Sequence, residues 1–346
     1  MVSVTDAAPP RSPQTAHADD EPLVVAARYD RFARDEAPGR CALYAHWAAL
    51  VRDDPRVARV LARIPETHRQ PPLVFAVSRL LGAPEDPPDA WADWVLTHAE
   101  DLVRECRARS IQTNEPLRCA ALLPALAQID GPIALLEVGA SAGLCLFPDR
   151  YSYRYGSLRL DPPGGESTVV LESAWAGPRP ALRLPEIVWR AGLDLEPLDA
   201  TDPADREWLT TLVWPGERDR RARIVAALDI AAAERPLLVR GDAAQPGVIA
   251  ALAASAPPEA TLVVTTPGVL AHVPRARRAS LIAAARAAGR WVTLDAPALH
   301  DAWQAPIAQN WPAHLFALAL DGRVLAAVDP LGARVEWRAG IGARGD

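Results

Sequence analysis

A short apolar run that ends in a turn of small residues carries the most chemical information in this chain. The segment LLEVGASAGL covers residues 135–144, with Glu137 near the end of the apolar run. Gly139 and Gly143 follow, where a helix is expected to begin. A parallel strand that ends in this way leaves backbone N–H groups and a helix N-terminus at the carboxyl edge of a sheet. We therefore expect a nucleotide-like ligand at this turn.

A second polar cluster lies upstream, between apolar runs. It comprises Gln112, Thr113, Asn114, Glu115 and Arg118. Thr113 or Asn114 could cap a helix that begins near Glu115. Alternatively, the cluster folds over the glycine turn as a polar clamp, with Glu115 and Arg118 binding substrate or cofactor. A guanidinium group is well suited to a ligand carboxylate.

The composition excludes several kinds of chemistry. All 37 basic residues are arginine. A Walker-type phosphate loop, the strand lysine of kinases and a pyridoxal Schiff base each need a lysine, so none of them is expected. The net charge is −6, and arginine is interspersed with acidic residues. No basic stripe marks a nucleic-acid surface, and the expected partner is a small molecule.

Cysteine and histidine usage predicts neither a metal site nor a disulfide framework. Cys41, Cys106, Cys119 and Cys145 form no C-x-x-C pair, which favours reduced thiols and a cytoplasmic location. The seven histidines show no i, i+3 or i, i+4 spacing. No run approaches the roughly 20 apolar residues of a membrane span.

The GASAG turn also resembles the G-x-S-x-G nucleophile elbow of hydrolases in sequence. A hydrolase that uses Ser141 is therefore a third, less favoured interpretation. Its base and acid would be His272 or His300 with Asp242 or Asp295.

The sequence divides into a tail and two regions of different texture. Residues 1–20 are polar and predict a disordered tail. Residues 21–130 show helical spacing with proline-containing breaks, which predicts an all-α N-terminal domain. Residues 131–346 alternate short apolar runs with alanine-rich helices, which predicts an α/β domain with a mostly parallel sheet.

Two features of residues 131–346 refine this sheet. Alternating tyrosines in residues 150–186 predict a β insert, whose tyrosines serve packing or form a lid over the ligand. Residues 314–328 predict an antiparallel hairpin with Asp321 and Gly322 in its turn.

Several longer motifs resemble a known family. They are QTNEPLRC (112–119), EVGASAGL with DRYSYRYG (149–156), GLDLEPLDATDP (192–203), LVWP (212–215) and VRGDA (239–243). In this order they resemble the bacterial domain-of-unknown-function family 2332, a resemblance that implies no particular activity. The core also looks like class I S-adenosylmethionine-dependent methyltransferases, whose E/D-x-G-x-G-x-G pattern matches except at Ser141. Pro148 follows closely and predicts a short or kinked first helix.

The methyltransferase resemblance implies roles for the first loop and the second strand. Gly139, Ala140, Ser141 and Gly143 would pass under the amino-acid and ribose portions of S-adenosylmethionine, with Glu137 anchoring the loop amides or the ammonium group. An acidic residue after the second strand would hold the ribose hydroxyls. A spacing of about 20 residues after the loop favours Asp161. The GLDLEP segment, which resembles the usual end of the second strand, favours Asp194. We choose Asp194, although a helix cap or turn carboxylate is the alternative.

The same resemblance implies roles at the later strands. Asp242 would reach the adenine amino group, unless it caps the next helix. Thr265 and Thr266 would lie where donor and acceptor meet. His272 would remove a proton, with Glu115 as the alternative base.

The remaining substrate contacts would come from Asn114, Arg118, Tyr151 and Thr266. The sequence lacks the D/N-P-P-Y tetrapeptide, which disfavours bases and glutamine as acceptors. We therefore expect methyl transfer to a small molecule, with a non-catalytic cofactor-binding or interaction protein as the alternative.

Overall fold

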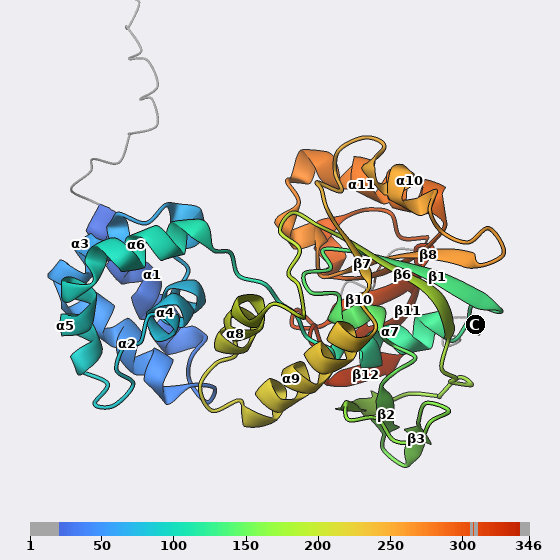
Figure 1. Cartoon of the computed structure of the whole chain (residues 1–346), viewed down its shortest axis with the longest axis horizontal. Helices are drawn as coiled ribbons and strands as arrows, with labels where there is room; N and C mark the ends of the chain where they lie inside the picture. The colour runs from blue at the N-terminus through green and yellow to red at the C-terminus, as the bar shows by residue number, and fades with distance from the viewer. Residues whose placement is uncertain (1–20, 305–306, 308–310, 340–346) are drawn as a thin grey trace, which may run out of the picture. The chain divides into compact units, whose positions relative to one another are not determined.

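A computed structural model describes residues 21–304, 307 and 311–339 (Figure 1). The tail expected over residues 1–20 lies outside the described residues. The chain forms two compact units. One contains the residues up to 111 together with 211–218, and the other contains residues 112–210 and 219–346.

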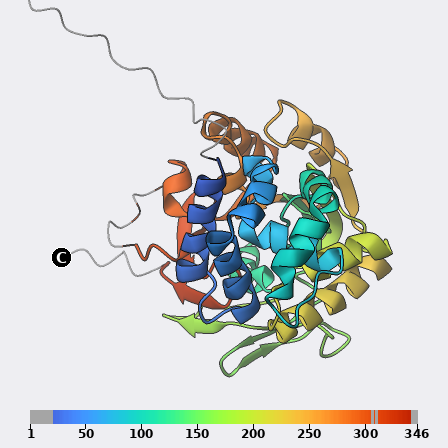
Figure 2. The same cartoon turned by 90° about the vertical axis from the view of Figure 1, so that its left-hand side faces the viewer.

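The first unit consists mainly of helices (Figure 2). These helices enclose a core of buried aromatic side chains. Its helices are α1 (Glu21–Asp35), α2 (Ala42–Asp53), α3 (Pro55–Ala62), α4 (Pro71–Leu80), α5 (Ala90–Thr97) and α6 (Ala99–Ala108). Trp47 and Trp91 stack with ring centroids 5.2 Å apart. Trp214, from the LVWP motif, packs against Tyr44 at 5.5 Å. This segment therefore completes the aromatic core, although it comes about 100 residues later in the sequence.

The second unit is built on a nine-stranded sheet with the order β5-β12-β11-β10-β9-β8-β1-β6-β7. The five parallel strands are β1 (Pro132–Val138), β6 (Glu186–Asp194), β7 (Leu237–Arg240), β8 (Thr261–Pro267) and β9 (Arg290–Asp295). The others are β5 (Ala174–Ala176), β10 (Phe316–Leu320), β11 (Arg323–Val328) and β12 (Arg334–Trp337). Each strand from β9 to β12 runs antiparallel to the next one, and β5 pairs in parallel with β12. The predicted α/β class and C-terminal hairpin are confirmed.

Strand β1 is the topological switch point of the sheet. It pairs in parallel with β6 on one side and with β8 on the other. The chain runs from β1 to β6 and β7 on one side and then crosses back to β8 on the other side, so the strand order reverses between β1 and β8. Such a sheet binds ligands at the carboxyl ends of the strands beside this point. The loop after β1 is the GASAG turn.

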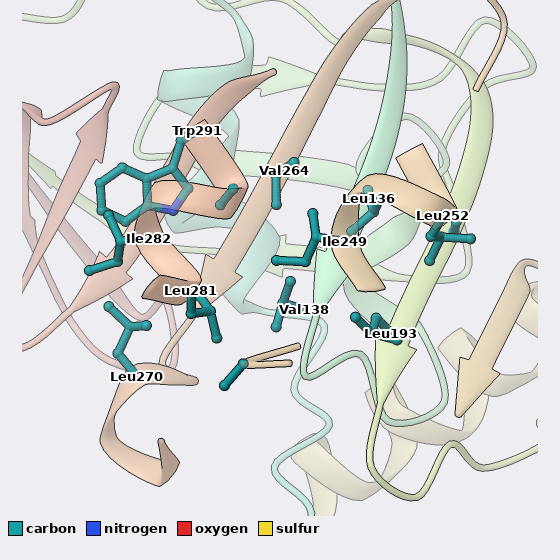
Figure 3. Packing of buried hydrophobic residues seen from close by; sticks show 13 residues of the cluster. Leu136, Val138, Leu193, Ile249, Leu252, Val264, Leu270, Leu281, Ile282 and Trp291 are labelled. Atoms are coloured by element: carbon teal, nitrogen blue, oxygen red, sulfur yellow. The ribbon is translucent and has the colours of Figure 1, made fainter. Parts of the chain in front are cut away.

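One face of the sheet is covered by α10 (Val248–Ala253) and α11 (Arg275–Ala288) (Figure 3). Leu136, Val138 and Val264 pack into this buried cluster. Side chains alternate along a strand, so Glu137 points to the opposite face. There it lies within electrostatic reach of Arg118, the first residue of α7 (Arg118–Leu126). Helices α8 (Pro203–Thr211) and α9 (Arg218–Ala233) connect β6 to β7.

The insert forms a separate three-stranded sheet from β2 (Ser152–Tyr155), β3 (Leu158–Leu160) and β4 (Val170–Glu172). Tyr151, Tyr153 and Tyr155 are fully buried. Their hydroxyls donate to the carbonyl oxygens of Leu144, Pro148 and Ala120, each at 2.6 Å. This bonding pattern favours the packing role over a lid.

The helix expected at Gly143 is replaced by a single 3-10 turn, Leu144–Leu146. Pro148 lacks a backbone N–H and clashes within a helix, which accounts for the early stop. A turn this short has no helix dipole to offer an anion, so the expectation of a helix N-terminus at this loop is corrected.

We predict that Gly192→Ala destabilises the second unit. A Cβ at Gly192 would lie 2.5 Å from Ala140 Cβ, so the loop would have to shift. We expect a loss of about 1–3 kcal/mol in the free energy of unfolding, measured by urea denaturation. Gly164→Ala is the control, since nothing lies within 4 Å of its added Cβ. Equal stability of the two variants would contradict this packing argument.

Candidate ligand-binding site

The loop after β1 has a backbone that only small residues tolerate well. Gly139, Ser141 and Gly143 have φ of +75°, +53° and +73°. An added Cβ at Gly139 would lie 2.7 Å from Val269 Cγ2. The left-handed backbone and this contact together explain glycine at position 139.

Asp194 holds this loop against the end of β6. Its Oδ2 accepts a 2.8 Å hydrogen bond from the Ser141 N–H, and its Oδ1 accepts one from the Glu196 N–H at 2.8 Å. A carboxylate has lone pairs for further donors, so ribose hydroxyls could still bind. Asp161, the alternative ribose ligand, pairs instead with Arg154 in the insert at 2.8 Å.

Glu137 is a buried carboxyl group with an unused oxygen. Glu137 is 4% exposed, and its Oε2 has no hydrogen-bond partner among the described residues. Burial raises its pKa well above the usual range, with a further contribution from Cys145, while Arg118 lowers it. In the strand register Glu137 lies between Gly192 and Thr265. The switch point therefore holds a hydrogen-bond acceptor without a donor.

The upstream polar cluster lies against the glycine loop. Asn114 Nδ2 donates to Ser141 Oγ at 2.9 Å, and the Ser141 hydroxyl donates to Gln112 Oε1. Gln112 Nε2 donates to the Glu196 carbonyl at 2.9 Å. Helix α7 begins at Arg118, and no side chain caps it. Gln112 and Asn114 therefore contact the glycine loop, as the clamp interpretation expects, whereas ligand binding by Glu115 and Arg118 stays a prediction.

Glu115 is enclosed by arginines from α9. It is 1% exposed, and its two oxygens accept from Arg220 Nε at 2.7 Å and Arg223 Nε at 3.0 Å. The Leu117 N–H also donates to Oε1, at 3.0 Å. Two guanidinium groups stabilise the carboxylate, which favours an anchoring role over the proton-accepting role predicted for it.

Arg118 links the ends of the central strands. Its Nη1 donates to the Pro267 carbonyl at 3.1 Å, and its Nε donates to the Pro330 carbonyl at 3.0 Å. Its charge lowers the pKa of both Glu137 and Asp295, so it lies within electrostatic reach of both. Arg118 is half-buried.

The remaining predicted site residues lie at or after the ends of β1, β7 and β8. Ala140 and Thr265 are buried at the loop and at the end of β8. Thr266 accepts from Trp291 Nε1 at 3.1 Å on the α11 face. Asp242 Oδ1 accepts from the Ala244 N–H at 2.9 Å, and its Oδ2 accepts from Arg277 at 2.9 Å. His272 ends the 3-10 turn Leu270–His272 and is exposed.

Asp295 was named only as a hydrolase partner, yet it has the second unused carboxyl oxygen. It is the last residue of β9 and fully buried. The Thr293 hydroxyl donates to its Oδ2 at 2.7 Å, while its Oδ1 has no partner among the described residues. Burial raises its pKa to about 7, against the lowering effects of the Thr293 hydroxyl, the Leu270 backbone N–H and the charges of Arg118 and Arg278. Its position at a strand end, like that of Asp194, was the available signal.

His300 has the matching unused donor. It is 8% exposed, and its Nδ1 accepts from the Ala302 N–H at 3.1 Å. The proton of the neutral ring therefore lies on Nε2, which has no partner among the described residues. Burial lowers the pKa of this ring to about 4.

The geometry gives little support to a hydrolase. The hydroxyl of Ser141 is bonded to two amide side chains. No histidine of the described chain is seen to hydrogen-bond to it, although a serine nucleophile needs such a base. Residues 21–304, 307 and 311–339 contain no group of three or more potential metal ligands. Within the same ranges no helix is long and apolar enough to span a membrane.

We predict that Glu115→Gln costs about 3–5 kcal/mol of unfolding free energy, because it leaves two guanidinium groups without their buried counter-charge. Urea denaturation measures the effect. Glu234→Gln is the control, because Glu234 also pairs with arginine but its side chain is 41% exposed. A similar small loss in both variants would show that the Glu115 cluster does not stabilise the fold.

We also predict opposite pH effects for Asp295 and His300. The raised pKa of Asp295 makes stability fall as pH rises from about 4 to about 7, because the native state keeps a proton that the unfolded state loses. The lowered pKa of His300 makes stability fall as pH drops from about 6.5 to about 4. The two effects oppose each other in the wild type.

Substitution of one of these two residues should reveal the pH dependence of stability that the other contributes. Relative to wild type, we expect Asp295→Asn to make unfolding free energy rise more steeply with pH, by up to about 1.4 kcal/mol per unit between about pH 4.5 and 6.5. His300→Gln should change the slope in the opposite sense. Urea denaturation across this range tests both. Unchanged slopes would contradict the assigned protonation states.

Comparisons with known proteins give a family and no activity. No curated protein and no solved structure matches the chain significantly. A family model described as "Uncharacterized protein conserved in bacteria (DUF2332)" matches residues 26–337, which is most of the chain. The chain therefore belongs to the DUF2332 family.

Proposed function

We propose that the carboxyl edge of the sheet binds S-adenosylmethionine and that the protein transfers its methyl group to a small molecule. The observation that carries this proposal is the unpartnered Oε2 of Glu137. A buried acceptor without a donor costs about 1–3 kcal/mol, so its retention calls for a ligand donor. The ammonium group of the methionine moiety is such a donor, and its charge would compensate the burial of a carboxylate.

The surroundings of Glu137 fit the rest of this cofactor. Arg118 lies within electrostatic reach and would bind the carboxylate of the methionine moiety. Asp194 lies at the end of the neighbouring strand and retains lone pairs for ribose hydroxyls. The 3-10 turn after the loop lacks the helix dipole that a pyrophosphate uses, which favours this cofactor over a dinucleotide.

A non-catalytic cofactor-binding or interaction protein is the second candidate. The observation in its favour is the internal bonding of the loop. The N–H groups of Gly139 and Ser141 already donate to Leu193 and Asp194, so fewer amides are available to a ligand. This candidate predicts binding of a cofactor or partner without methyl transfer.

Calorimetry with S-adenosylmethionine and S-adenosylhomocysteine tests the proposed site. We expect micromolar binding to the wild type, weakened at least about tenfold, or 1.4 kcal/mol, by Glu137→Gln. Glu172→Gln, at an exposed position in the insert, should bind like the wild type. Wild-type protein that binds neither compound would refute the proposal, and equal binding by Glu137→Gln would remove its structural basis.

A further inference from the structure

The side chain of Gln112 connects the loop after β1 to the loop after β6. Its Oε1 accepts from the Ser141 hydroxyl, and its Nε2 donates to the Glu196 carbonyl at 2.9 Å. The backbone N–H groups of Ser141 and Glu196 donate in turn to the two oxygens of Asp194, each at 2.8 Å. Gln112, Ser141, Asp194 and Glu196 therefore form a closed ring of hydrogen bonds that includes both loops.

The segment that carries Gln112 is held in place by the two residues that follow Thr113. Asn114 is 6% exposed, and its Nδ2 donates to Ser141 Oγ at 2.9 Å. Glu115 is 1% exposed and is bonded to two arginines of α9. The ring is therefore anchored to α9 through Glu115.

The ring also explains the serine at position 141. Its φ of +53° is uncommon for a residue with a Cβ, and glycine adopts such a conformation more readily. Glycine has no hydroxyl, so it could not bond to the Gln112 and Asn114 side chains. The hydroxyl therefore accounts for serine at a position where the backbone alone favours glycine.

The ring leaves bonding capacity on Asp194. This residue is half-buried, and each of its oxygens accepts one backbone N–H, so each oxygen keeps a lone pair for a further donor. The two donors come from different loops and together fix the plane of the carboxylate. A side chain that is fixed before a ligand arrives avoids the entropy cost of becoming ordered on binding.

We propose that Gln112 and Asn114 are positioning residues, which hold Asp194 in the orientation that binds the ribose hydroxyls of a nucleoside. This inference rests on the proposed function, because it takes Asp194 as the ribose ligand. In this role Gln112 acts through Ser141 and Glu196, and Asn114 acts through Ser141. Neither side chain needs to touch the ligand.

Calorimetric titration of the full chain with adenosine and with 2′-deoxyadenosine tests the inference, because these nucleosides differ by one ribose hydroxyl. We expect the wild type to bind adenosine at least about fivefold more tightly, since a hydrogen bond to a charged group is lost with the hydroxyl. Gln112→Ala and Asn114→Ala should each reduce this affinity ratio at least about threefold, because Asp194 is then no longer held in place. Thr113→Ala, at an exposed position of the same segment, should retain the ratio. A ratio of two affinities is insensitive to a general loss of folded protein, so it separates positioning from stability.

Two outcomes would overturn the inference. They are equal affinity of the wild type for the two nucleosides, and an affinity ratio that stays unchanged in both Gln112→Ala and Asn114→Ala. Calorimetry of the same samples with S-adenosylhomocysteine separates the inference from the proposed function. Binding of S-adenosylhomocysteine without a preference for adenosine would retain the proposed function and overturn the inference. A preference for adenosine that depends on Gln112 and Asn114, without binding of S-adenosylhomocysteine, would retain the inference and refute the cofactor.

Discussion

The hydrogen bond from the Ser141 N–H to Asp194 is the interaction on which the site depends. It joins the loop after β1 to the end of β6, at 2.8 Å. Left-handed backbone at Gly139, Ser141 and Gly143 allows the loop to turn there. The upstream cluster reaches the same point, because Asn114 and Gln112 bond to the Ser141 hydroxyl. Ser141 is therefore the residue at which the glycine loop, the end of β6 and the upstream cluster are joined.

Burial at this edge leaves two carboxyl groups incompletely bonded. Glu137 on β1 and Asp295 on β9 each keep one oxygen without a partner among the described residues. Glu115, equally buried, differs because two arginines and a backbone N–H satisfy it. This contrast separates a structural carboxylate from two that retain bonding capacity. It is the reason for proposing a ligand at Glu137 rather than at Glu115.

Much of the fold was predictable because it follows from local pattern. The hairpin predicted over residues 314–328 is formed by β10 and β11, and Asp321 with Gly322 forms its turn with positive φ at both residues. The pairing of β5 with β12 joins segments about 160 residues apart, and β5, with only three residues, is too short to show a periodic signal. The sequence predicted the contact of Asn114 with the glycine loop only as an alternative to capping. The bonding of Glu115 to α9 depends on tertiary packing, which residue spacing does not encode.

Glu137 Oε2, which has no partner among the described residues, is the atom proposed to bind a cationic ligand group. A crystal structure of the full chain with S-adenosylhomocysteine tests it most directly. We expect the ligand amino group within hydrogen-bond distance of Glu137 Oε2, with its ribose near Asp194. Nucleoside bound elsewhere, or Glu137 Oε2 bonded only to water in the presence of saturating ligand, would show that Glu137 does not bind this cofactor.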